Sequence, residues 1–314
     1  MINVFRTDDG IIRELPTFEG ANGIWVNLIH PTDDELVKVS DYYNIDPADL
    51  AAALDIEESS RVAIEDNYTL ILIDIPHPDD TDNNPYATFP LGIILVDDTI
   101  ITICSKATPI IKNFVKGAQK EFSTKKRMKF IYQILFSSAY LYQDNLRSLD
   151  KRRLAIEKQI NSNIKDTDLT ELHRFESALV YFETSLRANL AVVDRLRRYK
   201  RLDQYPEDAE LLDDVEVEYR QAIEMATTYR SIIDGTRQLL SAVIDKRLNN
   251  AMKFLTSVTV VMAIPTLISG IYGMNVAAEG MPFATSPFGF TIVCGIIILF
   301  SFITIIILRK NKML

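Results

Sequence analysis

Residues 254–278 read FLTSVTVVMAIPTLISGIYGMNVAA, and residues 287–308 read PFGFTIVCGIIILFSFITIIIL. Neither run contains a charged side chain. A hydrocarbon core about 30 Å thick is crossed by a helix of about 20 apolar residues, so each run is long enough to span a membrane. Two buried core helices are the alternative, but the second run is apolar on all sides, which is typical of a helix in lipid. We therefore predict transmembrane helices at 254–275 and 287–308, joined by a short loop at 276–286.

The charge of the chain is concentrated before these two runs. The whole chain has 43 acidic and 34 basic residues, and only one acid and three bases follow Lys253. The part that precedes the first run is therefore strongly acidic. Phosphate binding requires clustered cations, so we expect no nucleic-acid partner. An acidic body suits a protein that attracts cations.

Basic residues flank the two runs only on the sides that face away from the loop. The loop contains neither Lys nor Arg, and its one acid is Glu279. The positive-inside rule therefore places both termini in the cytoplasm and the loop outside. The first ten residues, MINVFRTDDG, lack the apolar core of a secretory signal. We expect a multi-pass protein of the cytoplasmic membrane with a basic cytoplasmic tail at 309–314. The flanking basic residues are Lys246, Arg247, Lys253, Arg309, Lys310 and Lys312.

Residues 1–122, which we call the head, alternate strand and helix signals and predict a cytoplasmic α/β domain. Residues 68–73 are rich in β-branched side chains and predict a buried strand, which Pro76 and Pro78 are expected to end. Two further apolar runs flank Asp-Asp at 97–98, which predicts a two-residue hairpin turn.

Residues 123–205, the arm, have a different character. Residues 121–202 contain neither Gly nor Pro, and apolar residues recur at three- and four-residue spacing. This pattern predicts two long antiparallel helices, either in a bundle or as a coiled arm. Pro206 then suits the first turn of a third helix, and no proline follows until Pro265. We expect a stalk helix at 206–253 that continues without a break into the first span.

The first span carries a stripe of small or weakly polar residues at helical spacing. Small residues allow membrane helices to pack closely, so the stripe predicts either a packing interface or the wall of a water-filled path. Two helices cannot enclose a path, so the second interpretation requires a symmetric oligomer around the first span. The stripe consists of Asn249, Met252, Thr256, Thr259, Ala263, Thr266, Gly270 and Gly273.

The first span ends in Gly273-Met274-Asn275, preceded by Gly-Ile-Tyr at 270–272. With this motif at the outer end of the penultimate span, the chain resembles the CorA family of magnesium channels. The resemblance covers the whole layout, from the acidic head through the arm and stalk to the basic tail. It implies an α+β membrane protein that forms a homopentamer, whose first spans line a pore that conducts Mg²⁺, with Co²⁺ or Ni²⁺ as further candidates.

The resemblance also assigns site residues. It implies that Gly273, Met274 and Asn275 form the selectivity filter, where neutral carbonyl oxygens hydrogen-bond the water shell of an ion that dehydrates reluctantly. A helix C-cap is the alternative use of Gly273 and Asn275. The implied pore and gate residues are Asn249, Met252, Leu255 and Thr266.

Regulation by intracellular Mg²⁺ is implied as well. Relatives sense the ion through carboxylates that bridge the head of one subunit to the stalk of the next. Asp214 lies at a position similar to the stalk ligand. The acidic pair of the head aligns near Ala-Ala at 51–52, so either Asp49 and Asp55 take this role or the site is altered. The loop lacks the acid that many relatives carry after Met-Pro, which leaves Glu279 either as a cation-attracting substitute or as a solvated residue.

The alternatives to a magnesium channel belong to three classes. A relative that transports another divalent ion, such as Zn²⁺, is the alternative within the family, although methionine in the motif favours the magnesium branch. A membrane-anchored sensor or scaffold without transport is a second class. The sequence has no HExxH, CxxC, glycine-rich phosphate loop or nucleophile elbow, so we do not expect an enzyme.

Overall fold

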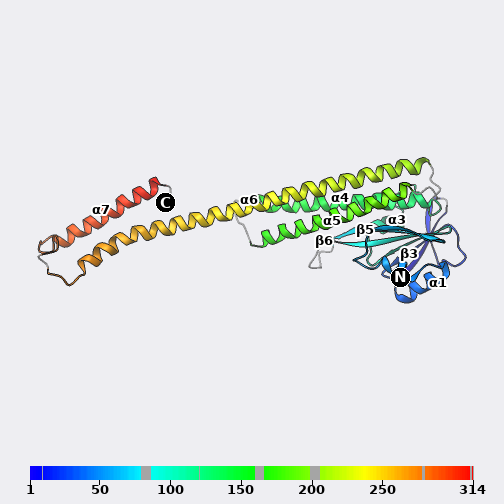
Figure 1. Cartoon of the computed structure of the whole chain (residues 1–314), viewed down its shortest axis with the longest axis horizontal. Coiled ribbons are helices and arrows are strands. Elements are labelled where there is room, and N and C mark those ends of the chain that lie inside the picture. The colour runs from blue at the N-terminus through cyan, green and yellow to red at the C-terminus, as the bar shows by residue number, and fades with distance from the viewer. Residues whose placement is uncertain are drawn as a thin grey trace. The chain divides into compact units, whose positions relative to one another are not determined.

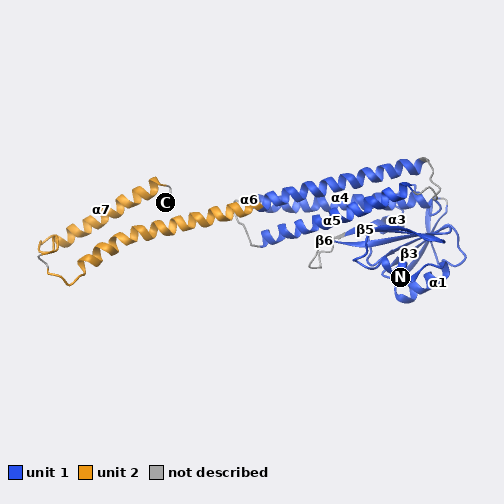
Figure 2. Ribbon diagram, viewed as in Figure 1, with its two compact units in different colours: residues 1–237 blue, residues 238–314 orange. Residues whose placement is uncertain are grey.

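The computed structural model describes residues 1–8, 10–78, 86–119, 121–159, 166–198, 206–277, 280–311 and 313. Figure 1 shows the chain coloured along its length, and Figure 2 shows its division into two compact units. Unit 1 covers Met1–Arg237, and unit 2 covers Gln238–Leu314.

Unit 1 contains a seven-stranded sheet with the strand order β2-β1-β3-β7-β6-β5-β4. All neighbouring strands are antiparallel except β3 and β7, which are parallel. The strands are β1 (Ile2–Asp8), β2 (Ile11–Leu15), β3 (Ile24–Ile29), β4 (Arg61–Ile64), β5 (Tyr68–Pro78), β6 (Tyr86–Val96) and β7 (Thr99–Cys104). Three short helices accompany them: α1 (Asp33–Tyr43), α2 (Pro47–Ala52) and α3 (Pro109–Val115).

Alternate residues of the central strands point to two different cores. Ile24 and Val26 join a cluster with Val39 of α1 and Leu50 of α2. Trp25 points the other way, because successive side chains of a strand face opposite sides of a sheet. Its ring lies 6.4 Å from that of Phe114 in α3 and 5.1 Å from that of Phe130 in α4. Helices therefore cover both faces, as expected for an α/β head.

The predicted hairpin is present. Val96 pairs with Thr99, and Asp97 has φ 44°, so Asp97 and Asp98 form the two-residue connection between β6 and β7. Asp tolerates this left-handed conformation better than most residues, which is why the pair is suited to a tight turn.

The prediction that Pro76 ends the strand is wrong, since β5 continues through it to Pro78, its last residue. The neighbouring strand β4 begins at Arg61, which pairs with Leu72, so the part of β5 beyond Leu72 pairs only with β6. The N–H of Asp74 points away from β6, toward the side that β4 does not cover here. The prolines have the same parity as Asp74, so the N–H groups that they lack would also point to that side, and no ladder bond is lost.

The two long helices of the arm are confirmed as α4 (Arg127–Gln159) and α5 (Asp166–Arg198). Residues 160–165, which connect the two helices, lie outside the described residues. Both helices pack against β5 of the sheet, so they form one compact unit with the head and are not a free coiled arm (Figure 1). The Tyr142 hydroxyl of α4 donates to the Asp74 carbonyl at 3.1 Å.

The third long helix, α6 (Pro206–Tyr272), has 67 residues and belongs to both units. In unit 1 its Tyr219 hydroxyl donates to Ser138 of α4 at 3.0 Å. In unit 2 it continues through Pro265, and α7 (Gly289–Lys310) follows. These two helices are long and apolar enough to cross a membrane. The predicted fold class is confirmed: a mixed α+β protein with long helices and two apolar helices at its C-terminal end.

Candidate ion path and regulatory acids

The motif Gly273-Met274-Asn275 follows directly after the last residue of α6. The Gly273 N–H still donates to the Ser269 carbonyl at 2.9 Å, as in a helix. Gly273 does not have a positive φ, so this helix end does not need glycine for a left-handed cap. The Met274 and Asn275 side chains are exposed. The C-cap interpretation therefore loses its main physical reason.

The connecting loop is fastened to the end of α6. The Tyr272 hydroxyl donates to the Pro282 carbonyl at 2.7 Å. This bond holds the chain that returns from the motif close to the helix end, and it leaves the motif at the tip of the helical hairpin. Glu279, predicted to attract cations here, lies outside the described residues.

The stripe on α6 faces away from α7. Half-buried or buried positions of α6 recur at Ser257, Val261, Ile264 and Ile268, and Ser257 donates to the Met313 carbonyl just beyond α7. At 3.6 residues per turn, these positions lie roughly opposite the stripe. The stripe residues from Met252 to Gly270 are exposed in this single chain. The stripe is therefore not the surface on which the two apolar helices of one chain pack.

Two threonines of the stripe present hydrogen-bond acceptors to the outside of the helix. The Thr259 hydroxyl donates to the Leu255 carbonyl, and the Thr266 hydroxyl donates to the Met262 carbonyl, each at 2.9 Å. A hydroxyl that donates its hydrogen to its own helix has only oxygen lone pairs left for an external partner. Such a surface accepts hydrogen bonds from water.

Large apolar side chains lie on the same side, at the start of the apolar run. The Met252 and Leu255 side chains are 60% and 67% exposed. Asn249, one turn earlier than Met252, is also exposed. The structure therefore leaves all three side chains free to meet other copies of the chain.

The predicted regulatory acids are not brought together within one chain. Asp49 accepts a hydrogen bond from the Tyr68 hydroxyl at 2.7 Å and lies 3.7 Å from the Arg61 guanidinium. Asp55 accepts from the Glu57 N–H at 3.0 Å. Asp214 is exposed on α6. Within the described ranges, no group of three or more His, Cys, Asp or Glu residues could hold a metal ion.

Residues 207–218 of α6 are rich in Asp and Glu, and arginines offset part of their charge, which was not predicted from the sequence. Arg197 of α5 forms ion pairs with Asp213, at 2.6 Å, and with Glu216. Arg220 pairs with Glu216 at 2.7 Å, and hydrogen bonds from Arg220 and Arg197 lower the pKa of Glu216. Repulsion among these acids is therefore smaller than their number suggests. The signal was the basic last turn of α5, which contains Arg195, Arg197 and Arg198.

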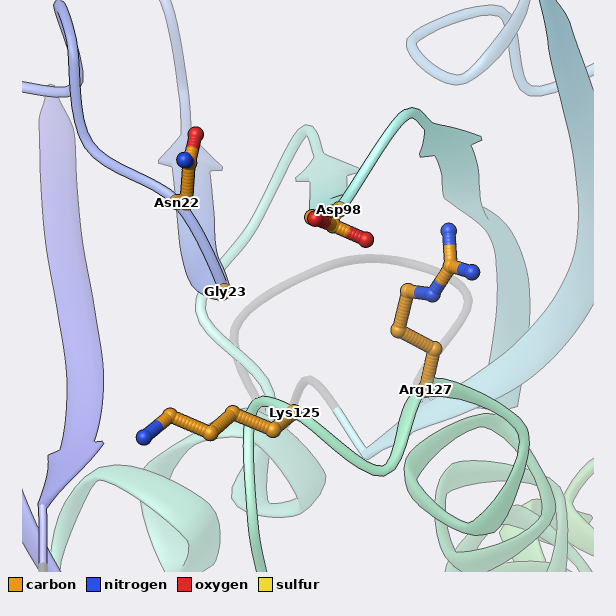
Figure 3. Close-up of a pocket in the computed structure, with 5 residues that line it drawn as sticks. All are labelled: Asn22, Gly23, Asp98, Lys125 and Arg127. Atoms are coloured by element: carbon orange, nitrogen blue, oxygen red, sulfur yellow. The ribbon is translucent and has the colours of Figure 1, made fainter.

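A pocket of about 280 Å³ lies in unit 1, apart from these residues. Figure 3 shows its lining, which comes from the β3 and β6–β7 ends and the start of α4. The Arg127 guanidinium donates to the Asp97 carbonyl beside it. The lining combines both signs of charge and includes none of the predicted site residues: Asn22, Gly23, Asp98, Lys125 and Arg127.

These features define a class: a membrane protein in which one helix joins an α/β domain to a two-helix apolar hairpin with an exposed polar motif at its tip. Comparison with known proteins makes the assignment specific. Residues 20–310 match the family described as CorA-like Mg²⁺ transporter protein. The chain belongs to the CorA family, as the motif predicted.

The relatives cover nearly the whole chain. The cobalt/magnesium transport protein CorA of Methanocaldococcus jannaschii is 29% identical over 303 residues, which cover 94% of this chain and 92% of the relative. The cobalt/magnesium transport protein CorA of Thermotoga maritima is 21% identical over 315 residues, which cover 99% and 88%. The complete structure of the M. jannaschii CorA magnesium transporter superposes with a TM-score of 0.84 at 27% identity and covers 99% of this chain and 98% of that one.

A more distant likeness supports the fold alone. The structure of the full-length CmaX protein superposes with a TM-score of 0.73 at 16% identity and covers 98% of this chain and 97% of that one.

Proposed function

We propose that this chain forms a passive channel for Mg²⁺ in the cytoplasmic membrane. One observation carries the proposal: the stripe of α6 is exposed opposite α7 and leads to the exposed Gly273-Met274-Asn275 motif. A helix in lipid gains nothing from an exposed row of hydroxyl and amide acceptors, whereas a helix that lines a water-filled path does.

The filter chemistry follows from the preferences of Mg²⁺. The ion is small, loses its water reluctantly and usually keeps several waters in protein sites. In this proposal, the Asn275 amide oxygens and the Gly273 carbonyls accept hydrogen bonds from those waters at the outer mouth. Neutral acceptors hold the hydrated ion weakly enough for it to leave, which conduction requires. Glu279 is proposed to raise the local cation concentration.

The gate is proposed at Met252 and Leu255. Copies of these apolar side chains around an axis form a constriction that empties of water when it is narrow. Asn249 lies on its cytoplasmic side and Thr266 on its outer side, so polar groups receive the hydrated ion before and after the dry segment.

The assembly is proposed to be a homopentamer in which the stripes face a common axis. Two helices cannot enclose a path, so the pore is completed only by symmetry. The spans at 254–275 and 287–308 cross the bilayer, and the basic flanks keep both termini in the cytoplasm.

Intracellular Mg²⁺ is proposed to regulate the channel through Asp214, which is exposed on α6. A divalent ion between Asp214 and the head of a neighbouring subunit, at Asp49 or Asp55, favours a closed arrangement. Loss of the ion shifts the population toward an open one, because the ion binds the two arrangements differently. The arginine pairs beside Asp214 and at Asp49 predict a weak site that responds only to high Mg²⁺.

Cobalt is the second candidate cargo, since the two relatives quoted above are named cobalt/magnesium transport proteins. The test is uptake of Mg²⁺, Co²⁺ and Zn²⁺ into liposomes that contain the purified full-length chain. We expect uptake of Mg²⁺ driven by its gradient alone. Uptake of Zn²⁺ without Mg²⁺ would assign the chain another cargo, and no uptake of any ion would favour a sensor or scaffold.

A further inference from the structure

In unit 2, basic residues lie near the point where α6 becomes apolar. Ser257 is fully buried, and its hydroxyl lies 2.8 Å from the Lys253 carbonyl and 3.0 Å from the Met313 carbonyl. The Met313 N–H in turn donates to the Leu308 carbonyl at 3.0 Å, so the tail curls back over the end of α7. These bonds bring the end of α7, which contains Arg309 and Lys310, to the part of α6 that contains Lys253 and Ser257.

Helical spacing extends this group along α6. Lys246 and Lys253 are two turns apart and lie on the face that continues to Ser257. We call Lys246, Lys253, Arg309 and Lys310 the basic cluster. All four side chains are exposed, and none of them has an ion-pair partner among the residues that the structure describes.

The absence of acid partners here contrasts with unit 1. In unit 1, arginines of α4, α5 and α6 form ion pairs with acids from the same or neighbouring helices, although the chain as a whole has a formal net charge of −9. The positive-inside rule explains why cations flank a span. It does not explain why a buried serine of α6 contacts the tail that follows α7, or why all four cations lack acid partners among the described residues. The paired arginines of unit 1 are Arg147, Arg153, Arg187, Arg197, Arg220, Arg230 and Arg237.

Apolar side chains adjoin the basic cluster on the membrane side. Phe254, next to Lys253, is 60% exposed, and Val258 follows it one turn later on the same side of α6. A ligand that fits this surface has an anionic head at the basic cluster and an apolar tail along Phe254 and Val258. Anionic phospholipids of the cytoplasmic leaflet have this form, whereas free phosphate does not.

We propose that the basic cluster is a binding site for the phosphate headgroup of an anionic phospholipid. The site lies on the α7 side of α6, so lipid bound there contacts the hairpin and not the stripe. The inference uses the membrane placement of the proposed function but not conduction. Lipid binding is measured without ion flux, so either claim can fail while the other stands.

The test is native mass spectrometry of the full-length protein in detergent, titrated with phosphatidylglycerol or with phosphatidylcholine of the same acyl chains. We expect preferential retention of phosphatidylglycerol. A Lys or Arg near an anionic surface contributes about fivefold in affinity, so Lys253→Gln with Arg309→Gln should weaken phosphatidylglycerol binding roughly 30-fold. The matched control, Arg13→Gln with Lys116→Gln, removes two exposed charges of unit 1 and should change nothing.

Two further arms keep the proposal falsifiable if the double variant folds poorly. The preference of the unaltered protein for phosphatidylglycerol should shrink at high salt, because screening weakens exposed charge pairs. Inorganic phosphate at equal concentration should not displace the lipid. Equal retention of the two lipids, unchanged binding in the variant, or displacement by inorganic phosphate would each overturn the proposal.

Discussion

Asn189→Ala is the substitution whose effect on the head follows most directly from the structure. Asn189 lies on α5 and is fully buried. Its Nδ2 donates to the Asp74 carbonyl at 2.7 Å, and its Oδ1 accepts from the Asp74 N–H at 2.9 Å. Asn189 thus takes the place of a β4 residue beside Asp74, since β4 begins only at Arg61, opposite Leu72. The same Oδ1 accepts from the Ser60 hydroxyl at 3.0 Å.

The cost of the substitution can be worked out bond by bond. Alanine leaves the Asp74 N–H without its partner, and an unsatisfied buried group costs about 1–3 kcal/mol. The Asp74 carbonyl keeps the Tyr142 hydroxyl at 3.1 Å, so its loss is closer to one ordinary bond, about 1 kcal/mol. The expected loss in the free energy of unfolding is about 2–4 kcal/mol, which corresponds to roughly 5–15 °C in melting temperature for a domain of this size.

The assay uses the single tryptophan of the chain. Trp25 is fully buried in unit 1, and its indole N–H donates to the Thr102 hydroxyl at 2.8 Å, so its fluorescence reports the folding of this unit. Ser60→Ala is the control, because it removes one of the bonds to Asn189 but leaves both bonds to the Asp74 backbone; we expect less than a third of the shift. Equal melting of Asn189→Ala and the unaltered protein would refute the role of Asn189 in holding α5 to the sheet.

Three further predictions concern pH, gating and regulation. Burial raises the pKa of Asp74 in the folded protein. Above about pH 4 the folded state therefore binds more protons than the unfolded chain, and stability falls as the pH rises through that window. In thermal melting, Asp74→Asn should have a higher melting temperature than the parent at pH 8 but not at pH 4. In the flux assay, Leu255→Gln should raise Mg²⁺ leak at high internal Mg²⁺ by about tenfold, the effect of lowering the barrier by about 1.4 kcal/mol. Phe254→Gln, on another face of α6, should not raise the leak, and equal leak in the two variants argues against the gate. Mg²⁺ should protect the head from protease in a saturable way, and Asp214→Ala should abolish this protection while Asp213→Ala keeps it; digestion that ignores Mg²⁺ in the unaltered protein would reject sensing.

The parts of the fold that the sequence predicted are those with local causes. The two apolar helices follow from composition, since a span needs a long uncharged run. The turn at 97–98 follows from the residue types that a tight hairpin requires. The wrong prediction at Pro76 depended on where β4 begins, and that is a property of the neighbouring strand. No local pattern around Pro76 contains this information.

The candidate site divides in the same way. The motif at 273–275 and the stripe were visible as spacing along one helix. The pairing of Arg197 with Asp213, and the bond between Asn189 and Asp74, join residues that only tertiary packing brings together. The face of α6 that α7 occupies is likewise a property of the helical hairpin, and it is what shows the stripe to be unoccupied within one chain.

The central claim is that Asn275 is part of the filter of a Mg²⁺ channel. Its most direct test is the rate of Mg²⁺ influx into liposomes that contain Asn275→Ala, compared with the unaltered protein and with Asn311→Ala at the other end of the hairpin. We predict that Asn275→Ala abolishes influx while its oligomer size is unchanged, and that Asn311→Ala conducts normally. Influx through correctly assembled Asn275→Ala at the parental rate would contradict it.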